Sequence, residues 1–209
     1  MEAIKNRQIS NIDLLNASGV GYYGYCKDTA VNEAEPPGDT FLAKLAQLWE
    51  ATALNAREAG ARVILCRLGI VLGREGGALQ RISPLVKLRL GAPWGSGKQW
   101  FSWIHERDMA EIFFFLLEHK NIEGPVNFTS PEPVINCEML GILNKVFSKK
   151  PLIPAIPGWV LRSILGEFSN VFLEGQRAVP EVLKKNGFVF QFPTFRQAVT
   201  DLLRPNQMY

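Results

Sequence analysis

The chain has 209 residues, 47% of them hydrophobic, so it can bury a substantial core, either as one large domain or as a domain with a smaller cap. Its 23 basic and 20 acidic residues give a formal net charge of +3 and form no basic stripe of the kind that binds nucleic acid. No apolar stretch has the length of a membrane span, and the N-terminus lacks the apolar segment of a signal peptide. We therefore expect a cytoplasmic protein whose partners include neither nucleic acid nor a membrane.

The cysteines and histidines argue against disulfides and metal sites. Cys26, Cys66 and Cys137 lie far apart and form no C-x-x-C motif, which favours reduced thiols. The histidines are His105 and His119, and no cluster of carboxylates and histidines surrounds either one in the sequence, so a metal site is not expected.

The first half of the chain predicts a strand, a helix and a second strand. Residues 1–10 are expected to be the last turns of a helix with Ile4 as its main apolar contact, and a buried strand is expected over Ile12–Ser18. After a polar loop, Asp39 is the expected N-cap of a helix that Gly60 ends. Apolar and small residues recur in this helix at helical spacing, namely Phe41, Leu42, Leu45, Leu48, Trp49, Thr52, Ala53 and Ala56.

The run of residues 61–73 is almost continuously apolar, which predicts a strand buried on both faces, as in a parallel sheet. Strand, helix and strand of these lengths predict a right-handed βαβ crossover. The fold class is therefore α/β, with a Rossmann-like parallel sheet. The glycine loop of residues 73–77 has a backbone that can approach a ligand closely.

Shorter elements are expected in the second half. Helices are predicted to about Leu90 with a kink at Pro84, from Met109, over 136–148, over 159–165, over 181–186 and after Thr194. Short strands are predicted over 100–104, 126–128, 175–180 and 188–192.

Four motifs carry a resemblance to a known family. They are Asn16–Gly24, Arg67–Gly73 with Gly76 and Gly77, Gly95–His105 with Asp108, and a C-terminal segment with Gly175–Arg177, Pro180, Gly187, Phe188, Phe190 and Pro193. In this order they resemble the carboxyl-terminal two thirds of the sugar-nucleotide-epimerase-related proteins. These are an atypical branch of the extended short-chain dehydrogenase/reductase superfamily. The match runs from about Ile12 to Leu203.

The resemblance implies an incomplete Rossmann-like sheet with a small α+β cap domain. The Rossmann part would comprise residues 1–80 and 99–130, and the cap residues 81–98 and 131–209. The family's first βαβ unit, with the glycine-rich loop that seats a dinucleotide pyrophosphate, has no counterpart before residue 12, so we expect a truncated fold. Gly19, Gly21 and Gly24 imitate the loop's spacing, but a loop follows them where the motif should open a helix.

The resemblance also implies a missing catalytic pair. Working members of the superfamily carry Tyr-x-x-x-Lys on the helix after the first strand of this chain. The tyrosine acts as general acid and base, and the lysine lowers its pKa. Aligning Trp49-Glu50 with the family pattern places Leu42 and Ala46 at these positions, and neither can transfer a proton.

The remaining candidate site residues each have an alternative structural role. Ser18 and Tyr23 are the candidate catalytic hydroxyls, although Ser18 can instead bond local backbone and one of Tyr22 and Tyr23 can belong to the core. The candidate cofactor contacts are Ser18, Gly69, Ile70 and Val71. The candidate phosphate contacts are Arg67, Arg74 and Arg81, with a buried carboxylate as the other possible partner of Arg67.

Two further groups have open roles. His105 and Asp108 are expected to order a loop and cap a helix, with Asp108 as the helix-starting residue. Trp94, Trp100 and Trp103 can form a stacking face for a base or sugar, or pack between the two subdomains.

Three hypotheses for function follow. The chain is a truncated relative of NADP-type epimerases without activity of its own, with NADP(H) as the cofactor of the full-length family. It can also be a non-catalytic module that binds a nucleotide-like small molecule or a separately encoded N-terminal half. The third hypothesis is an inactive product of gene decay or an inactive fragment. An open sheet edge and bare sheet faces predict a homo-oligomer.

Overall fold

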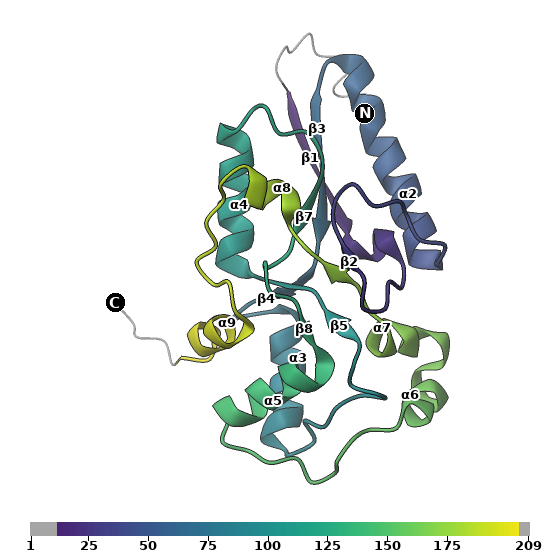
Figure 1. Cartoon of the computed structure of the whole chain (residues 1–209), viewed down its shortest axis with the longest axis vertical. Helices are drawn as coiled ribbons and strands as arrows, with labels where there is room; N and C mark the ends of the chain where they lie inside the picture. Colours follow the sequence, from purple (N-terminus) through teal and green to yellow (C-terminus); the bar gives the residue numbers. More distant parts are fainter. Residues whose placement is uncertain (1–11, 205–209) are drawn as a thin grey trace.

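The computed structural model describes residues 12–204, so the helix expected over residues 1–10, with Ile4, lies outside the described residues. Its centre is a parallel sheet of β1 (Asp13–Gly19), β3 (Arg62–Leu68) and β7 (Gly124–Phe128), in the order β1-β3-β7 (Figure 1). The strand, helix and strand predicted for the first half are confirmed, and the fold is α/β.

Two helices cover the faces of this sheet. Val63 and Leu65 of β3 pack with Ala53 of α2 (Phe41–Leu54), whereas Ile64 of the same strand packs with Ile112 of α4 (Glu106–Glu118). Successive side chains of a strand point to opposite faces, so both faces of β3 are buried. That is why its central residues 63–66 are all apolar. The helices lie on either side of the sheet in Figure 1.

The single strand predicted over residues 61–73 is wrong in one respect, because Gly69 divides it. β3 ends at Leu68, and β4 (Ile70–Leu72) pairs instead with β6 (Trp103–His105) in a separate parallel pair. A Cβ atom on Gly69 would lie 2.8 Å from the carbonyl oxygen of Ser102. Glycine is therefore required for this close crossing of two backbones.

The cap is a mainly helical lobe at the lower end of Figure 1. It contains α3 (Gly77–Lys87), α5 (Asn136–Val146), α9 (Phe195–Leu202) and the antiparallel pair of β5 (Trp100–Phe101) with β8 (Val134–Ile135). Its core includes Trp103 and Phe195, whose rings meet edge to face with centroids 5.4 Å apart. Helices α6 (Gly158–Leu165) and α7 (Asn170–Leu173) extend from this lobe.

The C-terminal segment returns to the central sheet. β9 (Arg177–Ala178) pairs with β2 (Ala30–Val31), and α8 (Glu181–Lys185) places Leu183 in the core on the α4 side. The strand predicted over 188–192 is wrong, because no strand forms there. The backbone amides of Gln191 and Phe192 donate to the carboxylate of Asp108 instead of to a neighbouring strand. The predicted division into residues 1–80 with 99–130 and 81–98 with 131–209 stays a prediction.

Helix α2 differs from the prediction at both its start and its outer face. Its N-cap is Thr40, whose side chain accepts from the amide of Ala43, and not Asp39. Ala53 is buried, but Phe41, Leu48 and Trp49 are 79%, 70% and 58% exposed. The apolar spacing therefore marks a helix correctly but does not mark only its buried side.

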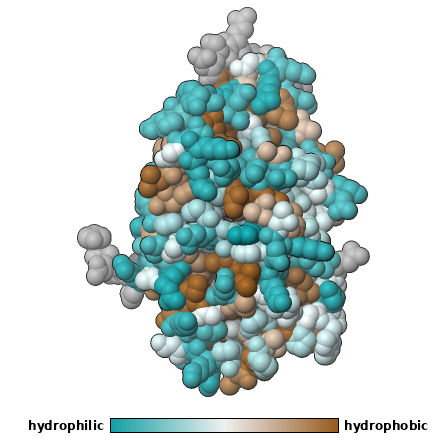
Figure 2. Space-filling model, viewed as in Figure 1, coloured by the Kyte–Doolittle hydropathy of each residue, from teal (hydrophilic) through white to brown (hydrophobic). Residues whose placement is uncertain are grey.

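Three further observations complete the fold. Cys26, Cys66 and Cys137 are unpaired, as expected. No helix within residues 12–204 is both long and apolar enough to cross a bilayer. Figure 2 shows apolar groups interrupting a mainly hydrophilic surface.

Candidate functional site

The carboxyl ends of β1 and β3 bring Ser18 and Arg67 side by side, because these two residues are paired in the strand register. Both side chains reach Glu50 of α2. Ser18 Oγ donates to Glu50 Oε1 at 2.7 Å, and Arg67 donates from Nε and Nη2 to the two carboxylate oxygens at 2.9 and 2.8 Å. Arg67 and Glu50 are only 3% and 4% exposed. The structure thus gives Arg67 the buried carboxylate partner that the sequence left as an alternative to phosphate.

A hydrogen-bond network continues from Arg67 through Tyr23. Arg67 Nη1 donates to the Tyr23 hydroxyl at 3.0 Å, which donates to Asn127 Oδ1 at 2.7 Å. The guanidinium also lies over the Tyr22 ring, 3.4 Å from its centroid. Burial raises the pKa of Tyr23 to about 12, which disfavours a role as base at neutral pH. Tyr23 is the core tyrosine, with its hydroxyl satisfied internally.

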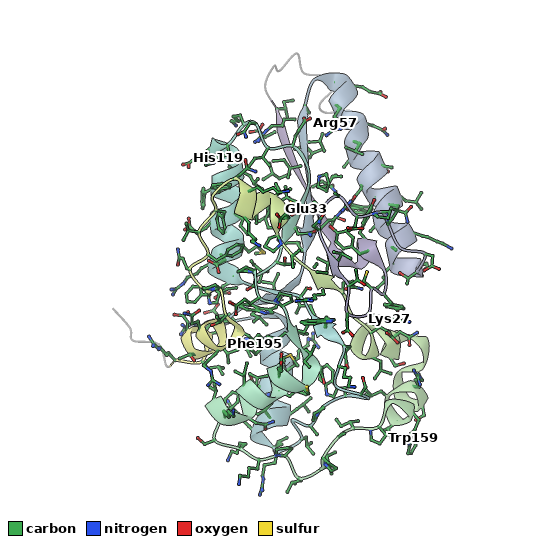
Figure 3. The ribbon with its side chains drawn as sticks, viewed as in Figure 1. Lys27, Glu33, Arg57, His119, Trp159 and Phe195 are labelled. Atoms are coloured by element: carbon green, nitrogen blue, oxygen red, sulfur yellow. The ribbon has the colours of Figure 1, made fainter. Side chains whose placement is uncertain are left out.

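Sequence reasoning missed the second carboxylate of this region, Glu33 (Figure 3). It accepts hydrogen bonds from the amides of Asn127, Glu181 and Val182 at 3.0, 3.2 and 3.3 Å. Burial raises its pKa. Glu33 thereby ties the polar loop after β1 to β7 and to the start of α8. Its position in a loop rich in acids, Pro and Gly gave no signal that it is buried. Glu50 did give a signal in the sequence, because it is the one acidic residue of α2 and Lys44 is the one other charged residue of that helix.

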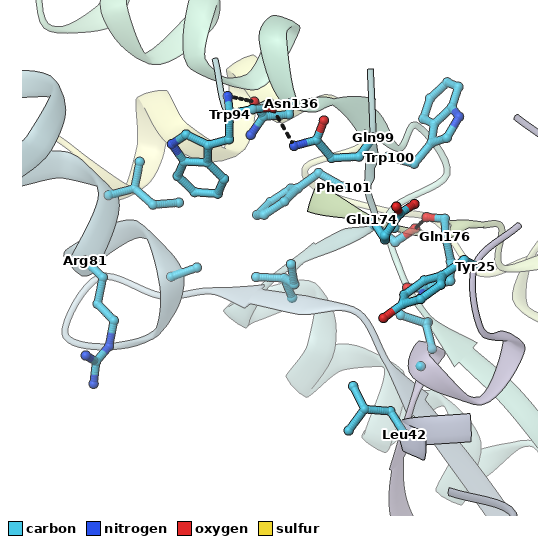
Figure 4. A pocket seen from close by; sticks show the side chains of 17 residues that line it. Tyr25, Leu42, Arg81, Trp94, Gln99, Trp100, Phe101, Asn136, Glu174 and Gln176 are labelled. Carbon is cyan, nitrogen blue, oxygen red and sulfur yellow. Dashed lines mark hydrogen bonds between the residues drawn. The ribbon is translucent and has the colours of Figure 1, made fainter. Parts of the chain in front are cut away.

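A cavity of about 310 Å³ lies between the sheet and the cap (Figure 4). The sheet side contributes Val20, Gly21 and Ile70, the first turn of α2 contributes Leu42, and α3 contributes Ala78, Arg81 and Ile82. Loops, short strands and the first residue of α5 complete it with Tyr25, Trp94, Gln99, Trp100, Phe101, Ser102, Asn136, Glu174, Gly175 and Gln176. Leu42 is the residue that occupies the tyrosine position in the alignment with the superfamily. A mostly apolar pocket with a few fixed polar groups is the usual form of a small-molecule site.

The polar groups of the cavity wall are held in place. The Trp94 amide donates to Asn136 Oδ1 at 2.9 Å, and Gln99 Nε2 donates to the Trp94 carbonyl at 3.1 Å (Figure 4). Trp100 Nε1 donates to Asp28, and the Arg177 guanidinium lies over the Trp100 ring. Trp94 and Trp100 line the cavity, whereas Trp103 is buried in the cap. Trp103 therefore takes the packing role considered from the sequence, and stacking of a base or sugar on Trp94 and Trp100 stays a prediction.

The structure brings only some of the predicted cofactor and phosphate contacts to the cavity. Ile70 and Arg81 line it. Gly69 lies against Ser102 and Thr129, and Val71 packs with the α4-side core. Arg74 donates to the carbonyl oxygens of Asp201 and Arg204 on the α9 side. Contacts with a cofactor stay predictions for all of these residues.

His105 and Asp108 order the chain around α4, but with different assignments from those expected. His105 is the N-cap, since its Nδ1 accepts from the amide of Arg107 at 3.1 Å. Asp108 instead holds the amides of Gln191 and Phe192. Burial lowers the pKa of His105 and raises that of Asp108. No group of three or more potential metal ligands forms in the described part of the chain.

The described residues fit the flat ring of a dinucleotide better than its pyrophosphate. Val20, Gly21, Leu42 and Ile70 offer an apolar wall to a flat ring. The glycines after β1 do not form a pyrophosphate loop, because Val20–Tyr23 is a short 3₁₀ turn and α2 begins only at Phe41. The first glycine of the loop 73–77 also meets a side chain, since a Cβ on Gly73 would lie 2.7 Å from a Glu106 oxygen.

A twisted parallel sheet with helices on both faces and a cavity beyond its carboxyl edge defines a Rossmann-type α/β protein. Comparison with known families assigns the chain more closely. The model of the NAD dependent epimerase/dehydratase family matches residues 1–128, and a domain of unknown function, DUF1731, matches residues 156–202. The chain belongs to the NAD dependent epimerase/dehydratase family, which confirms the resemblance seen in its motifs.

Individual relatives agree with this assignment. An epimerase family protein of Mycobacterium leprae is 41% identical over 195 residues, which is 92% of this chain and 63% of the relative. A chloroplastic epimerase family protein SDR39U1 homologue of Arabidopsis thaliana is 38% identical over 191 residues, 91% of this chain and 54% of the relative. The chain thus spans less than two thirds of the length of these two relatives.

A solved structure is also similar. The crystal structure of human epimerase family protein SDR39U1 with NADPH has a TM-score of 0.85 and 30% sequence identity. The aligned region covers 96% of this chain and 68% of the human chain.

Proposed function

We propose that this chain forms the substrate-facing part of an NADP-type epimerase family protein and is not, by itself, a competent epimerase or oxidoreductase. The observation that supports this most directly is Leu42 in the cavity wall, at the position where the superfamily carries its catalytic tyrosine. An alkyl side chain cannot act as general acid or base. Ala46, one turn further along α2, likewise cannot replace the lysine. We place this function in the cytoplasm.

The cavity supports binding of a flat, uncharged ring. Val20, Leu42 and Ile70 present apolar surface, and Gln99 and Asn136 are fixed polar groups on the opposite wall. NADP(H), when bound, would supply the redox chemistry of the family. The chain's own residues would position the ring and exclude water from it. The groups that seat the pyrophosphate would come from a part of the fold beside β1.

The open edge of β1 supports completion by another segment. β1 stands at one end of the order β1-β3-β7, so within the described residues one edge of this strand has no strand partner. Unpaired edges of this kind recruit further strands. We propose that the remaining part of the family fold adds its strand there.

Titration with NADPH tests the proposal. A ligand that binds only the folded state stabilises it, by about 2.7 kcal/mol at a hundred times its Kd, and so raises the melting temperature. We expect a rise that Ile70→Arg abolishes and that the matched surface variant Val189→Arg retains, since Val189 is exposed and lies outside the cavity. Turnover of a nucleotide sugar would contradict the proposed lack of activity. Absence of any shift at millimolar NADPH would favour an inactive fragment.

A second candidate function, association with a partner, rests on the outer face of α2. Phe41, Leu45, Leu48 and Trp49 are exposed there, and Lys44 is the charged residue on that face. At about 200 Å² for a large side chain, they expose on the order of 500 Å² of apolar surface. This is near the upper end of the apolar patches seen on monomers. We propose that a second copy of the chain covers this face.

A further inference from the structure

Charge is distributed unevenly along the chain, although the net charge is only +3. The segments 76–105 and 139–166 contain 8 basic residues and no Asp or Glu. These segments build much of the cap, including α3 and most of α5. The sequence expectation of no membrane partner rested on the lack of an apolar stretch long enough to span a membrane, and that criterion does not test for docking at a membrane surface.

The fold gathers five of these cations at one end of the cap. α3 ends at Lys87 and α5 ends at Val146, and the residues after each helix run beside one another. Arg89 Nε donates to the Lys150 carbonyl at 3.0 Å, and the Leu152 amide donates to the Arg89 carbonyl at 2.9 Å. We call this surface the basic end of the cap. It comprises Lys87, Leu88, Arg89, Lys145, Lys149, Lys150 and Leu152.

In the described part of the chain, the cations of the basic end have no acidic partners. No ion pair found within residues 12–204 involves any of the five. Lys87 lies over the Phe147 ring, 5.3 Å from its centroid. Basic residues near a helix C-terminus also interact favourably with the helix dipole. The dipoles of two helix ends explain one or two of the cations. They do not explain a surface that carries five basic residues and no acidic residue.

Large aliphatic side chains are exposed among these cations. Leu88 is 66% exposed and Leu152 is 64% exposed, and Leu85, Leu90 and Ile153 are also exposed. Hydrophilic and hydrophobic residues alternate at the lower end of the molecule in Figure 2. Basic residues interleaved with exposed aliphatic residues are typical of surfaces that lie on anionic membranes.

A second cavity, of about 590 Å³, opens at the same surface. Gly91, Pro93, Lys145, Lys149 and Lys150 are among its lining residues, with Asn144. Asn144 is 9% exposed, its Nδ2 donates to the Gly91 carbonyl at 2.7 Å, and its Oδ1 accepts no hydrogen bond from the described residues. Ammonium groups suit a phosphate, and a free amide oxygen suits a hydroxyl donor. A phosphoglycerol headgroup carries both groups.

We propose that the basic end of the cap is a docking surface for an anionic phospholipid membrane. The lysines and Arg89 lie at the plane of the lipid phosphates, Leu88 and Leu152 insert among the acyl chains, and the Asn144 cavity receives one headgroup. Nucleic acid would use the same cations. It is disfavoured because Leu88 and Leu152 are aliphatic and provide no stacking surface for bases.

Co-sedimentation of the full chain with vesicles tests the proposal. We expect binding to phosphatidylcholine vesicles that contain about a third phosphatidylglycerol, and none to pure phosphatidylcholine, with weakening as salt rises. Lys149→Ala with Lys150→Ala should weaken binding about 30-fold, at roughly fivefold for each basic residue near the surface. The matched control is Lys184→Ala with Lys185→Ala on α8, where Glu181 lies within 4 Å of both lysines. This control should bind like the parent chain.

A second pair of variants tests insertion. Leu152→Ser should weaken vesicle binding about tenfold, as expected for withdrawing one leucine side chain from an apolar environment. Val189→Ser, at a position that is also exposed, should leave binding unchanged. Equal binding to neutral vesicles, equal losses in the α8 control, or full displacement by millimolar glycerol phosphate would overturn the proposal. Tighter binding to duplex DNA than to anionic vesicles, lost in the same variants, would overturn it as well.

Discussion

Arg67 and Glu50 form a bidentate ion pair in the interior, with nitrogen-to-oxygen distances of 2.9 and 2.8 Å. The pair joins β3 to α2, the helix whose first turn contributes Leu42 to the cavity wall. Two desolvated charges are stable together only because each satisfies the other and because Ser18 and Tyr23 provide further hydrogen bonds. The strand end that resembles a catalytic edge is thus held by a structural network.

Breaking this pair should be costly. Glu50→Gln leaves the Arg67 charge buried without a counter-charge, so we expect a loss of about 3 to 5 kcal/mol of unfolding free energy. Arg67→Met alone should cost a similar amount. The double variant Glu50→Leu with Arg67→Met should be more stable than either single variant, because it leaves no unpaired charge. Urea denaturation measures all three, and additive losses in the double variant would contradict a coupled pair.

The two adjacent tyrosines should respond differently to loss of the hydroxyl. Tyr23→Phe removes an acceptor for Arg67 and a donor to Asn127, both buried, and should cost about 1 to 3 kcal/mol. Tyr22→Phe is the matched control, because the contact of Tyr22 with Arg67 is made by the face of its ring and survives the change. Thermal or urea unfolding compares the two variants. Equal losses of unfolding free energy in the two variants would mean that the buried hydrogen bonds of the Tyr23 hydroxyl do not stabilise the fold.

Stability should fall as the solution is acidified from neutral pH, because of His105. Burial lowers the pKa of His105, so the unfolded chain takes up a proton at a higher pH than the folded chain. The stability that His105 contributes is therefore complete above its ordinary pKa of about 6.5 and is lost as the pH falls toward the lowered folded value. Urea denaturation between pH 7.5 and about 5 measures this slope.

A variant pair identifies the group responsible. His105→Asn retains a side chain that can cap α4 and should flatten the slope by up to one proton per molecule. His119→Asn, which changes the histidine at the other end of the same helix, is the control variant. The pKa values of Asp108 and Glu33 are raised, so their contribution to stability changes with pH in the opposite sense to that of His105. That change lies at a lower pH, nearer the ordinary pKa of a carboxyl group. An unchanged slope in His105→Asn would assign the effect elsewhere.

The exposed face of α2 should control association. Phe41→Glu with Leu48→Glu places two charges on an apolar, exposed face and should convert an oligomer into a monomer with little loss of stability. The control is Val189→Glu, an equally exposed apolar position away from α2. Light scattering at micromolar concentration measures the mass. A parent chain that is already a monomer would contradict association through this face.

The local patterns of the sequence were sufficient for the class of fold. The apolar run of β3, the strand before α2 and the loop glycines predicted a parallel α/β sheet. The four motifs identified the family, and the alignment placed Leu42 and Ala46 at the tyrosine and lysine positions. These features are readable because the period of apolar residues and the residue types of a motif are properties of short segments.

Other features depend on which distant segments meet. Gly69 ends β3 because the backbone of Ser102 crosses it, and residues 188–192 form no strand because Asp108 takes their amides. Neither partner is near in sequence. The same holds for Glu33, whose three amide donors lie more than 90 residues away. The outer face of α2 is a similar case, because apolar residues at helical spacing identify a helix but do not show which of its faces packs against the core.

By itself, the sequence determined that this chain is an α/β member of an epimerase family and that it carries no Tyr-x-x-x-Lys pair on its first long helix. Only the tertiary structure decided that Arg67 belongs to a buried pair, that Leu42 lines a cavity and that the cations of the cap gather at one end. The physical reason is that hydrophobic periodicity acts over a few residues. The partner of a charge, by contrast, is set by strand register and helix packing across the whole chain.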